Sequence, residues 1–181
     1  MLDDFSRYVI AWKLCTSMAA SDVTDTLELA LQASSCSTVR VRHQPRLLSD
    51  NGPSYMSGEL AKWLNGHHIE HIRGAPCHPQ TQGKLERWHQ TLKNVRRANS
   101  PPDCLLFLLT LLENDYLPGG LEAQVAAFVE HYNHQRYHES LNNLTPADVY
   151  FGRGQAILLE RERIKRQTIQ QRRLLHHSQA A

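Results

Sequence analysis

The sequence patterns around two carboxylates, Asp50 and Glu86, constrain the fold of this chain more than any other feature. Asp50 ends a short apolar run and precedes Asn51-Gly52-Pro53, which is a strong turn signal. Glu86 follows after thirty-five intervening residues, in a segment whose apolar side chains recur at helical spacing. The members of that apolar face are Leu85, Trp88, Leu92 and Val95. The pattern predicts one acid at the tip of a strand and the other on an amphipathic helix.

A second face of the same predicted helix is polar. Its members, at steps of four, three and four residues, are Glu86, Gln90, Lys93 and Arg97. Mg²⁺ takes oxygen ligands, usually one or two carboxylates plus substrate phosphate. Two such ions about 3.5–4 Å apart can activate an attacking oxygen and stabilise a leaving one at a phosphodiester. Cations beside a metal-binding acid would hold a DNA backbone there; the alternative is two unrelated surface acids and a solvated helix face.

Several separate motifs agree in order and spacing with one known family. The runs Ser49–Pro53 and Gly74–Lys84, followed by the Glu86 helix, resemble the catalytic core of insertion-sequence transposases and retroviral integrases. These enzymes carry an Asp-Asp-Glu metal triad, and the thirty-five-residue spacer matches their pattern. The segments Tyr132–Leu141 and Leu144–Tyr150 are similar to the part that closes such domains. The resemblance covers residues 1–98 and 114–176.

This resemblance implies DNA transposition or integration, in which phosphodiester cleavage is followed by strand transfer at a two-metal site. It implies that Asp50 and Glu86 are catalytic and bind the metal, which would be Mg²⁺ or Mn²⁺. The residues that it places on DNA are Gln82, in the loop before the helix, with Lys84, Gln90, Lys93 and Arg97. It also implies a homo-oligomer that binds the element ends and the target DNA. The expected location is the bacterial cytoplasm, in association with the nucleoid.

The first acid of the triad is not found where the family has it. Residues 1–7 are similar to the turn after the second strand, whereas the first acid of the family lies upstream, on the first strand. We therefore expect Asp3 and Asp4 to be turn residues rather than the missing ligand. One interpretation is a transposase-type enzyme that is inactive or nearly so because it lacks this acid. The alternatives are a non-catalytic fragment that binds DNA or oligomerises, and an unrelated α/β domain with a basic tail.

The order of the predicted elements indicates an α/β domain. Strands are predicted at 8–14, 46–49 and 69–72, and helices after the capping residues Ser21 and Ser57. Together with the resemblance, this predicts a ribonuclease-H-like mixed sheet with flanking helices, lacking the first strands. The domain is expected to occupy residues 1–152, with an unusual insert at about 97–112. A capping box, Thr145-Pro146-Ala147-Asp148, is predicted to open its last short helix.

The positive charge is concentrated at the C-terminus. From Arg153 to Ala181 there are seven Lys or Arg and two Glu, a net charge of +5, whereas the whole chain carries +2. This segment contains no proline, and its only glycine is Gly154. We predict a basic helical tail over 153–181, for which DNA contact and a solvated helix are the two alternatives.

Neither a membrane span nor a zinc site is predicted. The longest apolar run, Leu105 to Leu112, is shorter than the about 20 residues that a spanning helix needs. The four cysteines form no Cys-x-x-Cys pair, and no cysteine pair follows His67, His68 and His71 at zinc-site spacing. We therefore expect free thiols in a reducing compartment.

Overall fold

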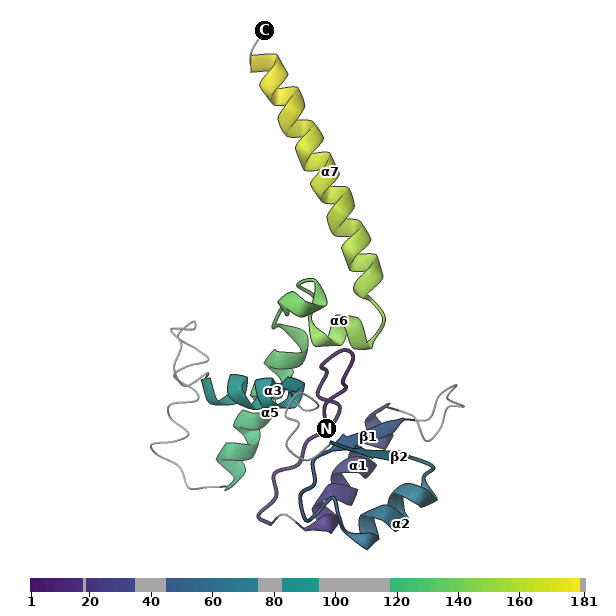
Figure 1. Ribbon diagram of the computed structural model, residues 1–181. Helices are drawn as coiled ribbons and strands as arrows, with labels where there is room; N and C mark the ends of the chain where they lie inside the picture. The colour runs from purple at the N-terminus through teal and green to yellow at the C-terminus, as the bar shows by residue number, and fades with distance from the viewer. Residues whose placement is uncertain (18, 35–44, 75–82, 95–117, 180–181) are drawn as a thin grey trace. The chain divides into compact units, whose positions relative to one another are not determined.

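The computed structural model describes residues 1–17, 19–34, 45–74, 83–94 and 118–179 (Figure 1). The backbone forms two compact units, Met1–Glu130 and His131–Ala181. The predicted insert at about 97–112 lies outside the described residues. The predicted division of the chain at residue 152 stays a prediction.

The first unit is built around two short parallel strands. β1 (Arg46–Ser49) pairs with β2 (Glu70–Arg73), with Arg46 opposite Glu70 and Ser49 opposite Arg73. The connection between them contains α2 (Gly58–Gly66), whose predicted cap is confirmed because the Ser57 side chain accepts a hydrogen bond from the Glu59 N–H. A parallel pair needs a crossover of this kind, since a tight turn would reverse the chain direction.

Two predictions for the N-terminal part were wrong. The strand expected over 8–14 is reduced to one antiparallel bridge between Val9 and Leu2, so no ladder forms that would extend it. The next helix, α1 (Ala20–Ser34), begins before Ser21. Its start is set by Asp22, whose carboxylate accepts hydrogen bonds from the Ala19 N–H at 3.1 Å and the Ser17 hydroxyl at 2.6 Å. An acid that reaches back in this way satisfies backbone donors at the helix start.

A small apolar core joins these elements. Leu60 and Leu64 of α2 are 0% and 2% exposed, and they pack with Leu27 of α1 and with Ile69, next to β2. Half-buried apolar side chains surround this cluster: Met1, Val23, Leu31, Leu47, Tyr55 and Trp63. Figure 1 shows α1 and α2 beside the two-stranded sheet. The end of β1 is therefore supported by a buried core.

The described part of the first unit also contains α3 (Gly83–Asn94) and most of α5 (Pro118–His134), which continues into the second unit. Trp88 of α3 contacts Phe128 of α5, with ring centroids 6.0 Å apart in an edge-to-face arrangement. Phe128 is buried and Trp88 half-buried, whereas Glu86 and Gln90 are exposed. Of the predicted apolar face of α3, Trp88 and Leu92 are at least half-buried, whereas Leu85 is 39% exposed and Val95 lies outside the described residues.

The second unit contains a 3₁₀ turn (Glu139–Leu141), α6 (Pro146–Tyr150) and α7 (Gly154–Gln179). The predicted capping box is confirmed, because Thr145 Oγ1 accepts from the Asp148 N–H and donates to the Asp148 carboxylate at 2.8 Å. The predicted tail helix is also confirmed, and most of its side chains are exposed. Within the described ranges, no helix is both long enough and apolar enough to cross a membrane.

Replacing Leu60 by Ala should destabilise the first unit by about 2–5 kcal/mol, because the change leaves a cavity in a fully buried position. Leu29→Ala is the matched control, since Leu29 is 44% exposed, and it should cost less than about 1 kcal/mol. Urea titrations followed by tryptophan fluorescence measure both, because all three tryptophans precede residue 131. Equal losses in the two variants would contradict the position of Leu60 in the core.

Asp148 should couple stability to pH. Burial alone raises the pKa of this carboxyl, but hydrogen bonds from Thr145 and Arg153 outweigh burial and hold the pKa below its ordinary value of 3.8. The resulting stabilisation is present above that value and is lost as the pH falls through the lowered pKa of the folded state. The difference in urea midpoint between the native chain and Asp148→Asn should therefore shrink below about pH 4, as measured by far-UV circular dichroism. A difference that does not change with pH would contradict this.

Candidate active site

Asp50 lies directly after the last residue of β1, as predicted. Its side chain is exposed, and Oδ1 accepts a hydrogen bond from the Gly52 N–H at 2.9 Å. A Cβ at Gly52 would lie 2.9 Å from the same oxygen, so a larger residue would push the carboxylate out of this hydrogen bond. The N–H groups of Tyr55 and Met56 both donate to the Gly52 carbonyl and close the turn. The local chain therefore holds one carboxylate oxygen and leaves the other exposed.

Two side-chain links tie the neighbours of Asp50 to the second strand. Ser49, which is 4% exposed, has its Oγ 2.8 Å from Nε2 of His71 and donates a hydrogen bond to the Asp50 carbonyl at 2.9 Å. Asn51 donates from Nδ2 to the Gly74 carbonyl at 2.9 Å. The Gly74 N–H in turn donates to the Ser49 carbonyl at 2.9 Å. The backbone on both sides of Asp50 is thus attached to β2 or to the residue that follows it.

Two neighbouring groups have shifted pKa values. Burial, and then the positive charge of Arg73, lower the pKa of His71 below its ordinary value of 6.5. Burial raises the pKa of the Tyr55 hydroxyl, and the negative charge of Asp50 raises it further. Both shifts favour the neutral forms of His71 and Tyr55 at pH 7.

Glu86 lies in the first turn of α3 and is exposed. Among the described residues, its side chain takes part in no hydrogen bond or ion pair. The structure therefore places both predicted acids at the surface, one at a strand end and one on a helix. Their assignment as catalytic and metal-binding residues stays a prediction.

The structure describes some of the predicted DNA-binding residues and not others. Lys84 donates from Nζ to both the carboxylate and the carbonyl of Asp4, at 2.8 and 2.7 Å. Gln90 is exposed on α3, and Lys93 lies in the last turn of that helix. Gln82 and Arg97 lie outside the described residues. The role of this set on DNA stays a prediction.

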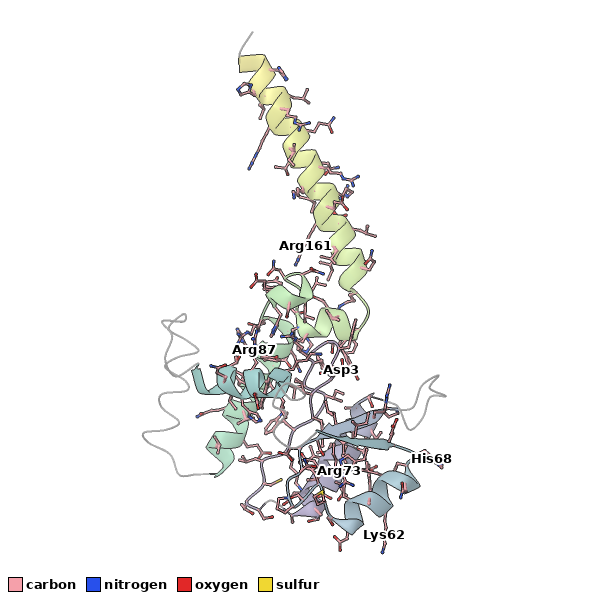
Figure 2. The ribbon with its side chains drawn as sticks, in the orientation of Figure 1. Asp3, Lys62, His68, Arg73, Arg87 and Arg161 are labelled. Carbon is pink, nitrogen blue, oxygen red and sulfur yellow. The ribbon has the colours of Figure 1, made fainter. Side chains whose placement is uncertain are left out.

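Each of the two acids near the N-terminus has a partner in the chain, Asp3 in its own turn and Asp4 on α3. Asp3 accepts hydrogen bonds from the Ser6 N–H and hydroxyl, at 2.7 and 2.5 Å, and so holds the turn at residues 4–6 (Figure 2 labels Asp3). Asp4 is paired with Lys84. Both contacts agree with the expectation that these acids belong to a turn.

The donor chemistry of the predicted acids fits a hard divalent cation. Carboxylate oxygens are what Mg²⁺ prefers, and one or two of them suffice when substrate phosphate completes the coordination. Asp50 and Glu86 are both exposed, and no cation in the described part of the chain neutralises either one. The described ranges contain no group of three or more His, Cys, Asp or Glu side chains placed to hold a metal ion. Asp50 and Glu86 therefore fit a divalent cation in the type of their ligand atoms.

The Ser49–His71 pair was not predicted. In the sequence, Ser49 stands out only as the first residue of the turn motif before Asn51-Gly52-Pro53. The pairing depends on the parallel register, in which Leu47 lies opposite His71, so that Ser49 and His71 share one face of the sheet. The alternation at residues 69–72 could have placed His71 on a face of its strand, but it does not reveal the partner strand.

Parallel strands joined by a helical crossover, with helices packed beside them, form a βαβ unit of an α/β domain. Residues 1–79 match a family model described as integrase core domain, and residues 116–146 match a second model with the same description. The two matches together span more than half of the chain. The chain belongs to the integrase catalytic cores of the retroviral-integrase-like superfamily.

The sequence relatives include retroviral polyproteins. The chain is 46% identical over 55 residues to the Gag-Pro-Pol polyprotein of squirrel monkey retrovirus, a match that covers 29% of this chain and 3% of that polyprotein. It is 42% identical over 83 residues to the Gag-Pro-Pol polyprotein of Mason-Pfizer monkey virus, covering 39% and 5%. The chain thus spans only a small part of the length of these relatives.

Solved structures share the fold at low sequence identity. A chain of the simian T-cell lymphotropic virus intasome, solved with the PP2A regulatory subunit B56 gamma, gives a TM-score of 0.61 at 21% identity, covering 82% of this chain and 46% of that one. The HTLV-2 integrase catalytic core domain, in complex with magnesium and in a trimeric form, gives 0.53 at 21%, covering 82% and 80%. At these identities the likeness concerns the fold alone.

Proposed function

We propose that this chain serves DNA transposition of the insertion-sequence type, with Asp50 and Glu86 as two acids of an Asp-Asp-Glu site. The observation that carries the proposal is the exposed Asp50 carboxylate, held by its own turn at the end of a strand in an integrase core. Mg²⁺ or Mn²⁺ is the proposed cofactor; the HTLV-2 relative was solved with magnesium. When bound, the metal would supply positive charge for the oxygens of a phosphodiester.

In this proposal, some residues of the chain bind the metal and others bind DNA. Asp50 and Glu86 supply the carboxylate ligands. Water attacks the phosphorus at the element end, and the bond to the 3′ oxygen breaks. The freed 3′-hydroxyl then attacks a phosphorus of the target DNA, which forms a new phosphodiester and releases the 3′-hydroxyl of the target strand. The residues that would hold phosphates or bases beside the acids are Gln82, Lys84, Gln90, Lys93 and Arg97.

Lys84 is available for this role despite its contact with Asp4. The pair is exposed, with 43% of the Lys84 side chain and 70% of the Asp4 side chain accessible. Exposed pairs of this kind contribute about 0–1 kcal/mol, so a DNA phosphate can compete with Asp4 for the ammonium group. We further propose that the 181-residue chain alone is inactive or nearly so, because the family resemblance assigns it two of the three acids.

A second candidate function is DNA binding without catalysis, and α7 is the feature that favours it. The acids of this helix are already paired with cations: Glu160 with Arg163 at 2.6 Å, and Glu162 with Arg166. Lys165 and Arg172 form no ion pair within the described residues. Their spacing of seven residues places them on one face of the helix. That face offers uncompensated positive charge to the phosphates of a DNA duplex.

Mn²⁺ binding tests the two acids without requiring catalysis. Paramagnetic broadening of backbone NMR signals should be strongest near Asp50 and Glu86 in the native chain. Asp50→Asn and Glu86→Gln should each weaken Mn²⁺ affinity at least about tenfold, because each removes a charged ligand. Glu59→Gln, which removes an exposed acid from α2, is the control and should change nothing. Broadening that survives both ligand substitutions would overturn the assignment.

Cleavage of labelled DNA ends in Mg²⁺ and in Mn²⁺ tests the proposed inactivity. The native chain should give no more product than Glu86→Gln. Product formed by the native chain and lost in Glu86→Gln would overturn the inactivity and show that a third ligand is recruited from elsewhere.

Binding of a fluorescent DNA duplex, measured by anisotropy over a range of salt concentrations, tests α7. Lys165→Gln with Arg172→Gln should lower affinity and reduce the slope of log K against log salt by about 1.8, the value for two lost phosphate contacts. Arg163→Gln with Arg166→Gln changes the net charge equally but removes cations already paired with acids, and its effect should be smaller. Equal effects of the two double variants would contradict the assignment to one face.

A further inference from the structure

The Ser49 hydroxyl has two partners but only one proton. It lies 2.9 Å from the Asp50 carbonyl oxygen, which can only accept, so Ser49 donates its proton there. It also lies 2.8 Å from Nε2 of His71. With its proton already used, the serine oxygen must accept from the ring, which requires a hydrogen on Nε2. The two distances together favour the tautomer with the hydrogen on Nε2, in which the ring donates to Ser49 and Ser49 donates to the Asp50 carbonyl.

This chain of donors ends on the backbone of Asp50. Ser49 is 4% exposed, so its oxygen has little access to water as a substitute for the ring N–H. Loss of the His71 donor would allow the hydroxyl to rotate or shift away from the Asp50 carbonyl. The Asp50 carboxylate is in turn fixed to the Gly52 N–H, so a change at residue 49 reaches the carboxylate through a short, hydrogen-bonded turn.

A second link strengthens the same connection. Asn51 donates to the Gly74 carbonyl at 2.9 Å, on the other side of Asp50. Asp50 thus stands between two residues that are both held by the β2 side of the sheet. Exposed carboxylates ordinarily sample several rotamers and lose side-chain entropy when they bind a ligand, and holding the backbone beneath them lowers that cost.

We propose that His71 is a positioning residue for Asp50: its Nε2–H donates to Ser49 Oγ, and Ser49 donates to the Asp50 carbonyl. This places the carboxylate in the orientation in which it binds a divalent cation. The inference rests on the proposed role of Asp50. In this proposal His71 acts on Asp50 through Ser49 and not as a metal ligand.

The protonated ring nitrogen can be observed directly in the full chain. A long-range ¹H–¹⁵N NMR spectrum at neutral pH should show the His71 hydrogen on Nε2. A hydrogen on Nδ1 alone would overturn the proposal, because Nε2 would then take the serine proton instead of donating one. This measurement requires neither metal nor DNA, so its result is independent of the proposed function.

Mn²⁺ affinity at Asp50, measured by paramagnetic broadening, tests the consequence. His71→Leu removes the donor and should weaken Mn²⁺ binding about tenfold, the lower end of the effect of groups that orient metal ligands. His71→Gln places an amide N–H near the position of Nε2 and should restore affinity to within about threefold of the native chain. His131→Leu, an exposed histidine of α5, is the matched control and should have no effect.

Ser49→Ala keeps the test decisive if His71→Leu fails to fold. It removes the middle of the link and should weaken Mn²⁺ binding by a similar factor, with no further loss when His71→Leu is added. Native affinity in a folded His71→Leu or Ser49→Ala chain would overturn the role of His71 and leave the role of Asp50 intact. A native chain without Mn²⁺ broadening at Asp50 would overturn both.

Discussion

The parallel pairing of β1 and β2 is the constraint on which the rest of the site depends. Each strand has only four residues, too few for the ladder alone to be stable in water. The pair persists because α2, which connects the strands, buries Leu60 and Leu64 with Leu27 and Ile69. The same pairing brings Ser49 next to His71 and Asn51 next to Gly74. The core therefore supports the strands, and the strands align the residues around Asp50.

The two candidate acids are supported in different ways. Asp50 is attached to the sheet through its neighbours and to its own turn through Gly52, so its backbone is closely held. Glu86 stands on the open face of α3, whose other face packs through Trp88 onto Phe128. One acid thus belongs to a rigid strand end and the other to a helix surface. A metal ion bound by both acids would connect these two elements. Within the described residues, no hydrogen bond or ion pair joins the two acids.

Exposed ion pairs involve some cations of the chain and leave others without an acid partner among the described residues. Lys84 is bound to Asp4, and the acids of α7 are bound to Arg163 and Arg166. Such pairs at the surface are weak and screened by salt. They are therefore exchangeable for phosphate, whereas Lys165 is already without an acid partner among the described residues. The weakness of the pairs is what makes a polyanion an effective competitor.

Features that arise from contacts between residues close together in the chain could be predicted from the sequence. The turn after Asp50, the Ser57 cap, the Thr145–Asp148 capping box and the tail helix follow from contacts within a few residues, and family motifs in the same order indicated the fold. The strand expected at 8–14 failed because a strand needs a partner ladder, which propensity does not supply.

Contacts between residues far apart in the chain are seen only in the folded structure. Ser49 and His71 are 22 residues apart, and Asp4 and Lys84 are 80 apart. No local pattern encodes such pairs, because they arise from strand register and from how the elements pack. The acids could thus be found in the sequence, but the groups that hold Asp50 in place could not.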